Sequence, residues 1–487
     1  MNTFRLYPLL GLDSVGVYIV GFNLNNKCIR MKLKIVFLLA ASLFFSAAGD
    51  AQETWTLERC IEYALSNNIT IKQQGLNVSN AENTLRQSQW SQTPTISGSG
   101  SQSLSFGRSR DNSNFSAVDK NSWSGSFGVG SQVELFGGLN KRNTIAKNKL
   151  DLQSALLDVE KTRNDVSLNV VASYLQVLFN EEQVLISQRQ VELTKSQVER
   201  TQKLVDAGNL SQSNLLEIRS QQAQEEVALV NAQNQLDIAY LTLKQLLELS
   251  ADTQFKIDHP SNIPMNEQYV LASPGSLFES SLGLPQIKSA EVKVESAERG
   301  VKVAQSGYYP TLSFSAQYGT SFFNQAQELK SMTTDASGNP VAIYGKQAIS
   351  DQLRKNQTTN LGLNLSIPIF SSFRNKYSVN NARIGYTAAQ LNLQQQRNVL
   401  YKEIAQAHAD AVGALKKFHA TQKARDAFAE TFTNADKKFN VGAANSLDYN
   451  TAKNNLSKSE SDLLQAKYEF IFKTKILDFY KGIPIKL

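Results

Sequence analysis

The sequence predicts an α+β membrane protein with an internal duplication, in which a transmembrane β-barrel with four strands per chain is continued by long coiled-coil helices. Three observations lead to this fold class: an export signal near the N-terminus, two halves that repeat each other, and strands in which apolar and polar residues alternate. The chain has 487 residues, 41% hydrophobic and 19% charged. It is therefore long enough for two or three domains and is not a disordered chain.

Residues 1–51 have the pattern of an N-terminal extension and an export signal. Met31, which we expect to be the true start, opens a basic segment directly before the apolar run Ile35–Phe45. That run is too short to span a bilayer, although a buried helix is an alternative interpretation. Small residues follow it, so cleavage is expected after Ala48 or Ala51.

The two halves of the remaining chain align without gaps over long stretches. Leu135–Leu139 reads again as Ile369–Phe373 at an offset of 234, and the same offset relates Gly208 to Gly442. Upstream the offset is 216, so the second half carries 18 extra residues. We expect two structural repeats, 52–270 and 271–487, each reading helix, two strands, long helix, turn and helix.

Each repeat contains a long helix that returns through a second one. The long helices are expected at 139–207 and 373–441, because apolar residues recur every seven positions and no proline interrupts them. The returning helices are expected at 211–249 and 445–482. The seven-residue seam of the first long helix consists of Ile145, Leu152, Val159 and Val166, then Val170, Val177, Val184, Val191, Val198 and Val205.

The turns between these helices are predicted from their capping residues. Gly208 and Gly442 can supply the left-handed conformation that ends a helix. Ser211 and Asn445 can then cap the helices that follow.

Four segments alternate apolar and polar residues and are predicted to be strands, near 95–108, 121–136, 310–325 and 356–370. Segments of this kind are typical of a transmembrane barrel, although alternation also fits a half-buried soluble sheet. Four strands cannot close a barrel, and open edges are not tolerated in lipid. The chain is therefore expected to oligomerise as a dimer with eight strands, a trimer with twelve, or higher.

The composition excludes several other classes of protein. The net charge is +7, of which +3 falls in residues 1–51, so the rest is near +4, too weak a bias to indicate nucleic-acid binding. Two cysteines and three scattered histidines predict neither a disulfide framework nor a metal site. Cys60 lies on an amphipathic stretch and is expected in the core, and we expect no lipid anchor.

No enzyme signature is present, and no cofactor is expected. The pairs Gly98/Gly100 and Gly128/Gly130 lack the third glycine of a dinucleotide site. The acidic pairs Glu181-Glu182 and Glu225-Glu226 are interpreted as solvated helix faces.

The order and spacing of these elements resemble the TolC family of outer-membrane efflux channels over about residues 52–487, including Leu365–Phe370 before the second long helix. The resemblance implies a homotrimer with a twelve-stranded barrel in the cell outer membrane and an α-helical coiled-coil barrel across the periplasm. It also implies passive export in a tripartite efflux or type I secretion system. The implied partners are a periplasmic adaptor protein and, indirectly, an inner-membrane pump.

The resemblance also assigns roles to the two turns, which in the family close the tunnel and meet the adaptor. The positions implied for adaptor contact are Leu204, Val205, Gly208, Ser211, Phe439, Val441, Gly442, Ala443 and Asn445. The positions implied for the lumen constriction are Asp448, its first-half equivalent Asn214, and Thr451. Three copies of Asp448 would form a carboxylate ring that favours cations. A solvated aspartate near a helix N-terminus is the alternative interpretation.

Two other functions remain open from the sequence. A periplasmic coiled-coil adaptor or scaffold would have one hairpin and lipoyl-like domains, whereas this chain has two hairpins and two strand pairs. An adhesin-like or receptor barrel would use the extended loops 107–122 and 324–357.

Overall fold

The computed structural model describes residues 54–110, 117–119, 121–253, 255–260 and 273–483, so the predicted signal and its cleavage sites lie outside the described residues. The chain divides into two units. The smaller comprises Met1–Thr54 and Gln254–Lys256, of which Thr54, Phe255 and Lys256 are described. The larger comprises Trp55–Thr253 and Ile257–Leu487 and holds all the features discussed below.

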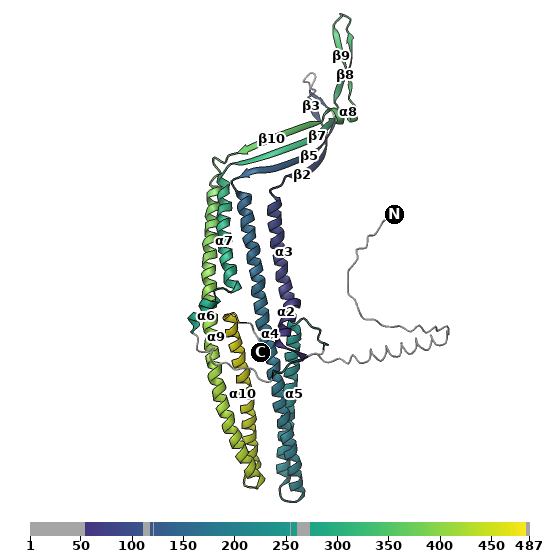
Figure 1. Cartoon of the computed structure of the whole chain (residues 1–487). Helices are drawn as coiled ribbons and strands as arrows, with labels where there is room; N and C mark the ends of the chain where they lie inside the picture. The colour runs from purple at the N-terminus through teal and green to yellow at the C-terminus, as the bar shows by residue number, and fades with distance from the viewer. Residues whose placement is uncertain (1–53, 111–116, 120, 254, 261–272, 484–487) are drawn as a thin grey trace, which may run out of the picture. The chain divides into compact units, whose positions relative to one another are not determined.

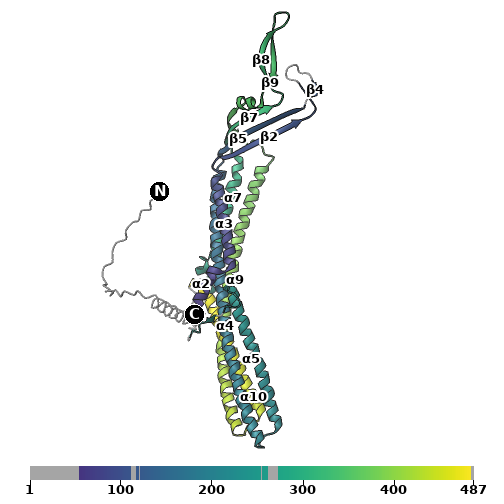
Figure 2. The same ribbon diagram turned by 90° about the vertical axis from the view of Figure 1, so that its right-hand side faces the viewer.

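The larger unit combines long helices with a four-stranded sheet (Figures 1 and 2). The helices are α2 (Leu57–Asn67), α3 (Ile69–Trp90), α4 (Asn140–Asp206), α5 (Gln212–Leu246), α6 (Pro274–Ser281), α7 (Pro285–Gln305), α8 (Ile349–Lys355), α9 (Arg374–Asn440) and α10 (Ser446–Tyr480), with a 3-10 turn at Ser306–Tyr308. The strands are β2 (Thr95–Ser105), β3 (Arg108–Arg110), β4 (Ala117–Asp119), β5 (Ser122–Gly137), β7 (Thr311–Phe323), β8 (Gln327–Thr334), β9 (Pro340–Lys346) and β10 (Thr358–Ser366). Two further strands, β1 (Thr54–Trp55) and β6 (Lys256–Ile257), each span both units.

The internal duplication is confirmed by the helices. The helices α4 and α9 have 67 residues each, and α5 and α10 have 35 each. All four begin and end at positions 234 residues apart. Even the strand-to-helix joints agree, because the N-cap residues Leu139 and Phe373 both have positive φ, 65° and 61°. The repeat thus preserves backbone conformation as well as the order of elements.

The four long strands form one antiparallel sheet in the order β10-β7-β5-β2. The two repeats meet at β5 and β7, and β2 and β10 are the outer strands of this sheet. β10 ends at Ser366, although a strand was expected to reach 370. Pro368 has no backbone N–H to donate to a ladder, which explains the earlier end.

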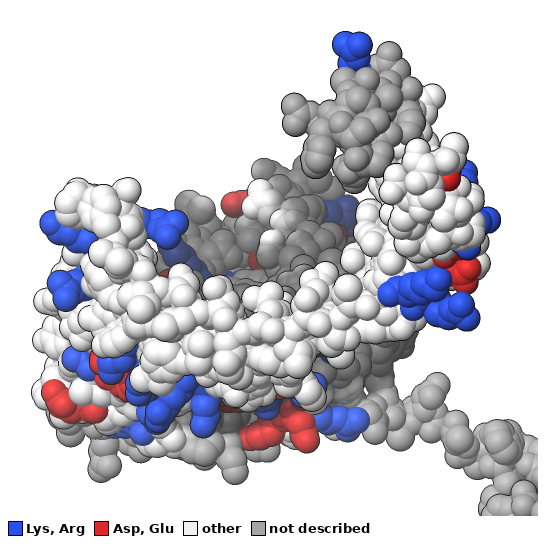
Figure 3. Space-filling view, turned by 90° about the horizontal axis from the view of Figure 1, so that it is seen from above, with Lys and Arg blue, Asp and Glu red and all other residues white. Residues whose placement is uncertain are grey.

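The strand register gives the sheet one apolar and one polar face. The apolar face carries Ile96, Val129, Val133, Phe314, Tyr318, Leu361, Leu363 and Leu365. The opposite face carries Gln132, Ser313, Ser315, Gln317, Asn360 and Asn364. Figure 3 shows a largely uncharged surface over this region, with the charged side chains at its margins. The alternation of apolar and polar residues along the strands therefore places the apolar side chains on one face of the sheet and the polar side chains on the other.

The two expected loops contain secondary structure of their own. β3 and β4 pair within residues 107–122, and β8 and β9 pair within 324–357, followed by α8. The amide of Gln352, on α8, is buried and fixes the base of the longer excursion. It accepts a hydrogen bond from the Phe323 N–H (2.8 Å) and donates to the carbonyls of Phe323 and Gln347 (both 3.1 Å).

The helices pack along one another rather than around a single centre. α4 contacts α3, α5, α7 and α10, and α9 contacts α7 and α10.

Cys60 on α2 is buried, as expected, and burial raises the pKa of its thiol to about 12. Among the described residues, no helix is both long and apolar enough to cross a bilayer. A second-repeat core cluster consists of Leu277, Ile287, Leu400, Ile404, Ala407, Ala411 and Leu477.

Candidate functional site

The turns that join α4 to α5 and α9 to α10 have the same backbone geometry. Gly208 and Gly442 lie in the left-handed region, with φ of 74° and 78°. In the first turn the Gly208 N–H donates to the Val205 carbonyl (2.9 Å) and the Asn209 N–H to that of Leu204 (2.9 Å). These two bonds define a Schellman motif, which satisfies the last carbonyls of the helix.

The second turn repeats this pair of bonds. The Gly442 N–H donates to the Phe439 carbonyl (3.1 Å), and the Ala443 N–H donates to the Lys438 carbonyl (2.8 Å). A Cβ added at Gly208 or Gly442 would have no heavy atom within 4 Å. Glycine is therefore required at these positions by φ and not by lack of space.

The starts of the two returning helices differ. Asn445 caps α10, since its Oδ1 accepts a hydrogen bond from the Asp448 N–H (2.7 Å). The expected side-chain cap at Ser211 is wrong, because the Ser211 hydroxyl donates instead to Asn214 Oδ1 (3.2 Å). In α5 the corresponding N3 amide, the Asn214 N–H, donates instead to the backbone carbonyl of Ser211 (3.1 Å).

The positions implied for adaptor contact are unequally accessible. Val441 is 79% exposed, and Gly442 and Ala443 beside it are also exposed. Phe439 is half-buried and packs on Tyr449, with ring centroids 4.8 Å apart. Of the first-turn positions, Leu204 and Val205 are half-buried, while Gly208 and Ser211 are exposed.

The three positions implied for the constriction lie close to the turns. Asp448 and Thr451 are exposed on α10, and Asn214 is half-buried on α5. Among the described contacts, none joins one of these three side chains to another. The Asp448 carboxylate lies in the first turn of α10, where the helix dipole favours negative charge.

Polar contacts tie the two hairpins together just beyond the turns. On α4, the Arg200 guanidinium donates to the side chain and the carbonyl of Asn440, the latter at 3.3 Å. The Ser446 hydroxyl donates to Glu217 on α5 (3.0 Å). The amide of Gln221 donates to Asn454 on α10 (3.4 Å). The two hairpins are therefore joined near their turns by polar hydrogen bonds, which bonds to water can replace.

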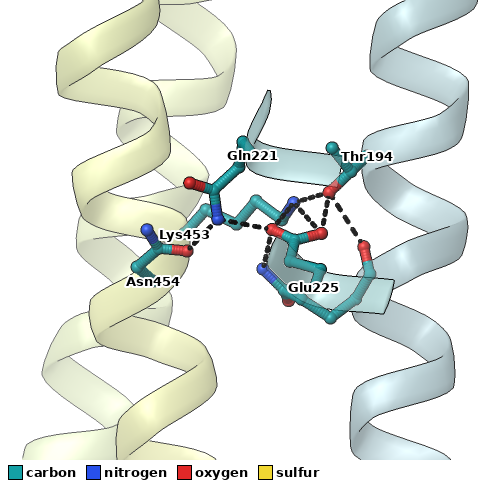
Figure 4. Close-up of polar contacts among 6 residues, drawn as sticks. Thr194, Gln221, Glu225, Lys453 and Asn454 are labelled. Carbon is teal, nitrogen blue, oxygen red and sulfur yellow. Dashed lines mark hydrogen bonds and ion pairs between the residues drawn. The ribbon is translucent and has the colours of Figure 1, made fainter. Parts of the chain in front are cut away.

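Further along the helices, a buried ion pair joins the two repeats (Figure 4). Lys453 Nζ on α10 lies 3.0 Å from Glu225 Oε1 on α5, and their side chains are 3% and 8% exposed. Thr194 on α4 bonds both partners, and Gln221 donates to the same carboxylate oxygen at 2.9 Å. Burial lowers the pKa of Lys453, and the Glu225 carboxylate opposes that shift.

The sequence interpretation missed this cluster. Glu225 was assigned to a solvated helix face, and that assignment is wrong because Glu225 is buried. A signal was present: Ile218, Glu225, Ala232 and Ala239 follow one another at seven-residue spacing, and all four are buried. The glutamate thus occupies a seam position, where a charge needs a partner. That partner, Lys453, lies 228 residues away.

Comparison with known proteins gives concordant results. Residues 60–248 and 281–471 match the profile of the outer membrane efflux protein family. Toxin and drug export protein A of Aggregatibacter actinomycetemcomitans is 22% identical over 66% of this chain and 64% of that protein. The chain therefore aligns with less than two thirds of that relative. Two solved structures, each 18% identical and each matching 88% of this chain, are similar in fold. They are CusC (TM-score 0.71, 92% of that chain) and VceC of Vibrio cholerae (TM-score 0.69, 96% of that chain).

Proposed function

The chain belongs to the outer membrane efflux protein family, and from this premise we propose that it forms the outer-membrane channel of a tripartite efflux or type I secretion system. In this role it passively exports small molecules or proteins received from a periplasmic adaptor and an inner-membrane pump.

Family membership confirms several predictions at the level of the family. These are the resemblance to TolC-type channels, the fold class, a role in efflux, and a location in the outer membrane with extension into the periplasm. Members of this family are channels rather than enzymes.

The observation that supports a channel best is the sheet with two outer strands. Every residue of β2 and β10 is exposed, and the apolar face they share carries large side chains. Unpaired strand edges are costly in lipid, so further strands must cover them. Pairing of β10 with β2 of a second copy would repeat the β5–β7 contact of the two repeats.

We take the assembly to be a homotrimer, which supplies twelve strands. In that assembly the turns at Gly208 and Gly442 form the periplasmic mouth. Val441 and Ala443, small and exposed, are the positions best suited to pack against an adaptor. Asp448 contributes one carboxylate per copy to the constriction, together with Thr451, three residues further along α10, and Asn214, the equivalent position in the first repeat.

The test is to purify the protein from outer-membrane extracts, determine its mass in detergent and record single-channel currents in a planar bilayer. We expect a particle of three chains with discrete, cation-selective openings. A stable monomer or dimer would contradict the trimer, and a trimer without conductance would contradict the channel.

A further inference from the structure

The repeat leaves one helix face exposed whose counterpart is covered. Lys453, Ser461 and Tyr468 on α10 each bond a residue of α4, namely Thr194, Gln183 and Glu182. Their equivalents 234 residues earlier, Arg219, Val227 and Asn234 on α5, are all exposed. Val227 is 61% exposed and is accompanied on α5 by Leu216 at 57% and Val230 at 61%. Arg219 donates a hydrogen bond to Gln202 on α4 (2.9 Å). The rest of this exposed stripe, which we call the α5 outer face, has no hydrogen-bond partner among the described residues.

The complementary face is equally visible on α9. Thr194 is 1% exposed on α4, whereas its equivalent Phe428 on α9 is 37% exposed. The equivalents of Gln183 and Glu182 are Lys417 and Lys416, and both are exposed. Thus the surface that α4 uses to receive α10 exists on α9 and lies open.

We propose that the α5 outer face of one copy packs against α9 of a second copy, in the register of the 234-residue repeat, with Arg219 over Phe428. The proposal rests on the oligomeric channel described above. The partner is a second copy because the same repeat equivalence holds for the sheet and for the helices. The contact of β5 with β7 is equivalent to a contact of β10 with β2, and the contact of α4 with α10 is equivalent to a contact of α9 with α5. The outer strands of the sheet and the exposed faces of α5 and α9 are therefore expected to contact the same neighbouring copy on the same side.

The pairs created by this register are chemically compatible. Arg219 meets the face of Phe428, an arrangement that favours a cation–π contact. Lys416 can donate to the amide oxygen of Asn234. Val227 meets the aliphatic stem of Lys417, whose ammonium is 2.8 Å from Glu469 of its own chain. No pair brings like charges together.

In this register, the contact between hairpins within one chain differs chemically from the contact between hairpins of two chains. Within a chain, Lys453 pairs with the buried Glu225 carboxylate and donates to Thr194. At the equivalent level between chains, Ser459 replaces the glutamate and Phe428 replaces the threonine. Ser459 is buried and donates to the carbonyl of Leu456 (2.7 Å). The seam between copies consequently lacks a buried ion pair.

Disulfide trapping of the full-length protein in its membrane tests the register. Arg219→Cys combined with Phe428→Cys is expected to give covalent species of two and three chain masses under mild oxidation. Ser461→Cys with Gln183→Cys is the control within one chain, because Gln183 donates to the Ser461 hydroxyl (3.0 Å), and it should crosslink without any increase in mass. The native Cys60 is buried and should not compete.

A shifted pair identifies a wrong register. Glu226→Cys with Phe428→Cys displaces one thiol by about 10 Å along α5 and is expected to give no link. A link from the shifted pair, or no link from Arg219→Cys with Phe428→Cys in a protein whose mass is that of an oligomer, overturns the proposal while the channel stands. A monomeric mass overturns the proposed assembly itself.

A charge substitution provides an independent measurement. Phe428→Glu changes a partly exposed residue and places a carboxylate opposite Arg219. It is expected to raise the temperature at which the oligomer dissociates in detergent, and the gain should vanish in an Arg219→Gln background. A gain that persists without Arg219, or a loss in both backgrounds, contradicts the contact.

Discussion

The two helical hairpins, α4–α5 and α9–α10, have the same lengths and the same glycine turns but bury different side chains. The first provides Glu225 and Thr194, which receive a lysine of the second. The second has Ser459 and Phe428 at the equivalent positions, where no acid is available. Duplication has therefore preserved the backbone of the two hairpins. The side chains have diverged, so the first hairpin provides the buried carboxylate and the second provides the lysine that pairs with it.

The largest effect is expected from removing the buried cation. Lys453→Ala leaves the Glu225 carboxylate buried and unpaired, which should cost about 3–5 kcal/mol. The expected result is a large drop in the midpoint of thermal or denaturant unfolding. Lys417→Ala is the matched control, because its pair with Glu469 is 47% and 40% exposed. An exposed pair of this kind contributes about 0–1 kcal/mol.

The pH dependence of stability sharpens the same comparison. The pKa of Lys453 is lower in the folded chain than in the unfolded one. Between these two values the unfolded chain binds more protons, so the free energy of unfolding should rise with pH across that alkaline window. In Lys453→Met this contribution should disappear. A steeper rise in the variant than in the wild type would contradict the assignment.

The contrast between the conserved backbone and the diverged side chains also explains which features could be predicted from the sequence. The ends of α4 and α9 lie within one residue of the expected 139–207 and 373–441, because the glycines and the seven-residue period act locally. The charge at Glu225 was misinterpreted because the lysine that stabilises it comes from the other repeat. The short strands and α8 were interpreted as loops, although β3–β4 and β8–β9 pair as local hairpins. The hydrogen bonds of Gln352 could not be foreseen, because they reach Phe323, 29 residues away.

The third prediction compares the two glycine turns. Gly442→Val and Gly208→Val each place a β-branched residue at positive φ, at a cost of roughly 1–2 kcal/mol. Trimers should still form, since no heavy atom of the chain lies within 4 Å of a Cβ added at either position. Export, measured as dye accumulation in the native host, should fail in Gly442→Val because Val441 and Ala443 shift. Intact export in this variant would exclude the second turn as the adaptor contact.

The fourth prediction concerns the helix caps. Asn445→Ala removes the bond from the Asp448 N–H and should destabilise the first turn of α10 by about 1 kcal/mol. Ser211→Ala removes no cap bond from α5 and should change little. Hydrogen exchange of the first-turn amides measures both effects, with an expected acceleration of about fivefold in Asn445→Ala only. Equal acceleration in both variants would show that the caps are equivalent after all.

The smallest expected effect on stability, and the most specific on transport, concerns Asp448. Its carboxylate is exposed and the cap bond uses its backbone N–H, so Asp448→Ala should assemble normally. Removal of three carboxylates from the constriction should lower the preference for cations by about fivefold, equivalent to ~1 kcal/mol. Planar-bilayer reversal potentials in a potassium chloride gradient measure this preference. The first hairpin offers the reciprocal change: Asn214→Asp introduces an acid at the equivalent position and should strengthen cation preference. If Asp448→Ala leaves selectivity and conductance unchanged while Asn214→Asp alters them, the first hairpin, rather than the second, lines the mouth.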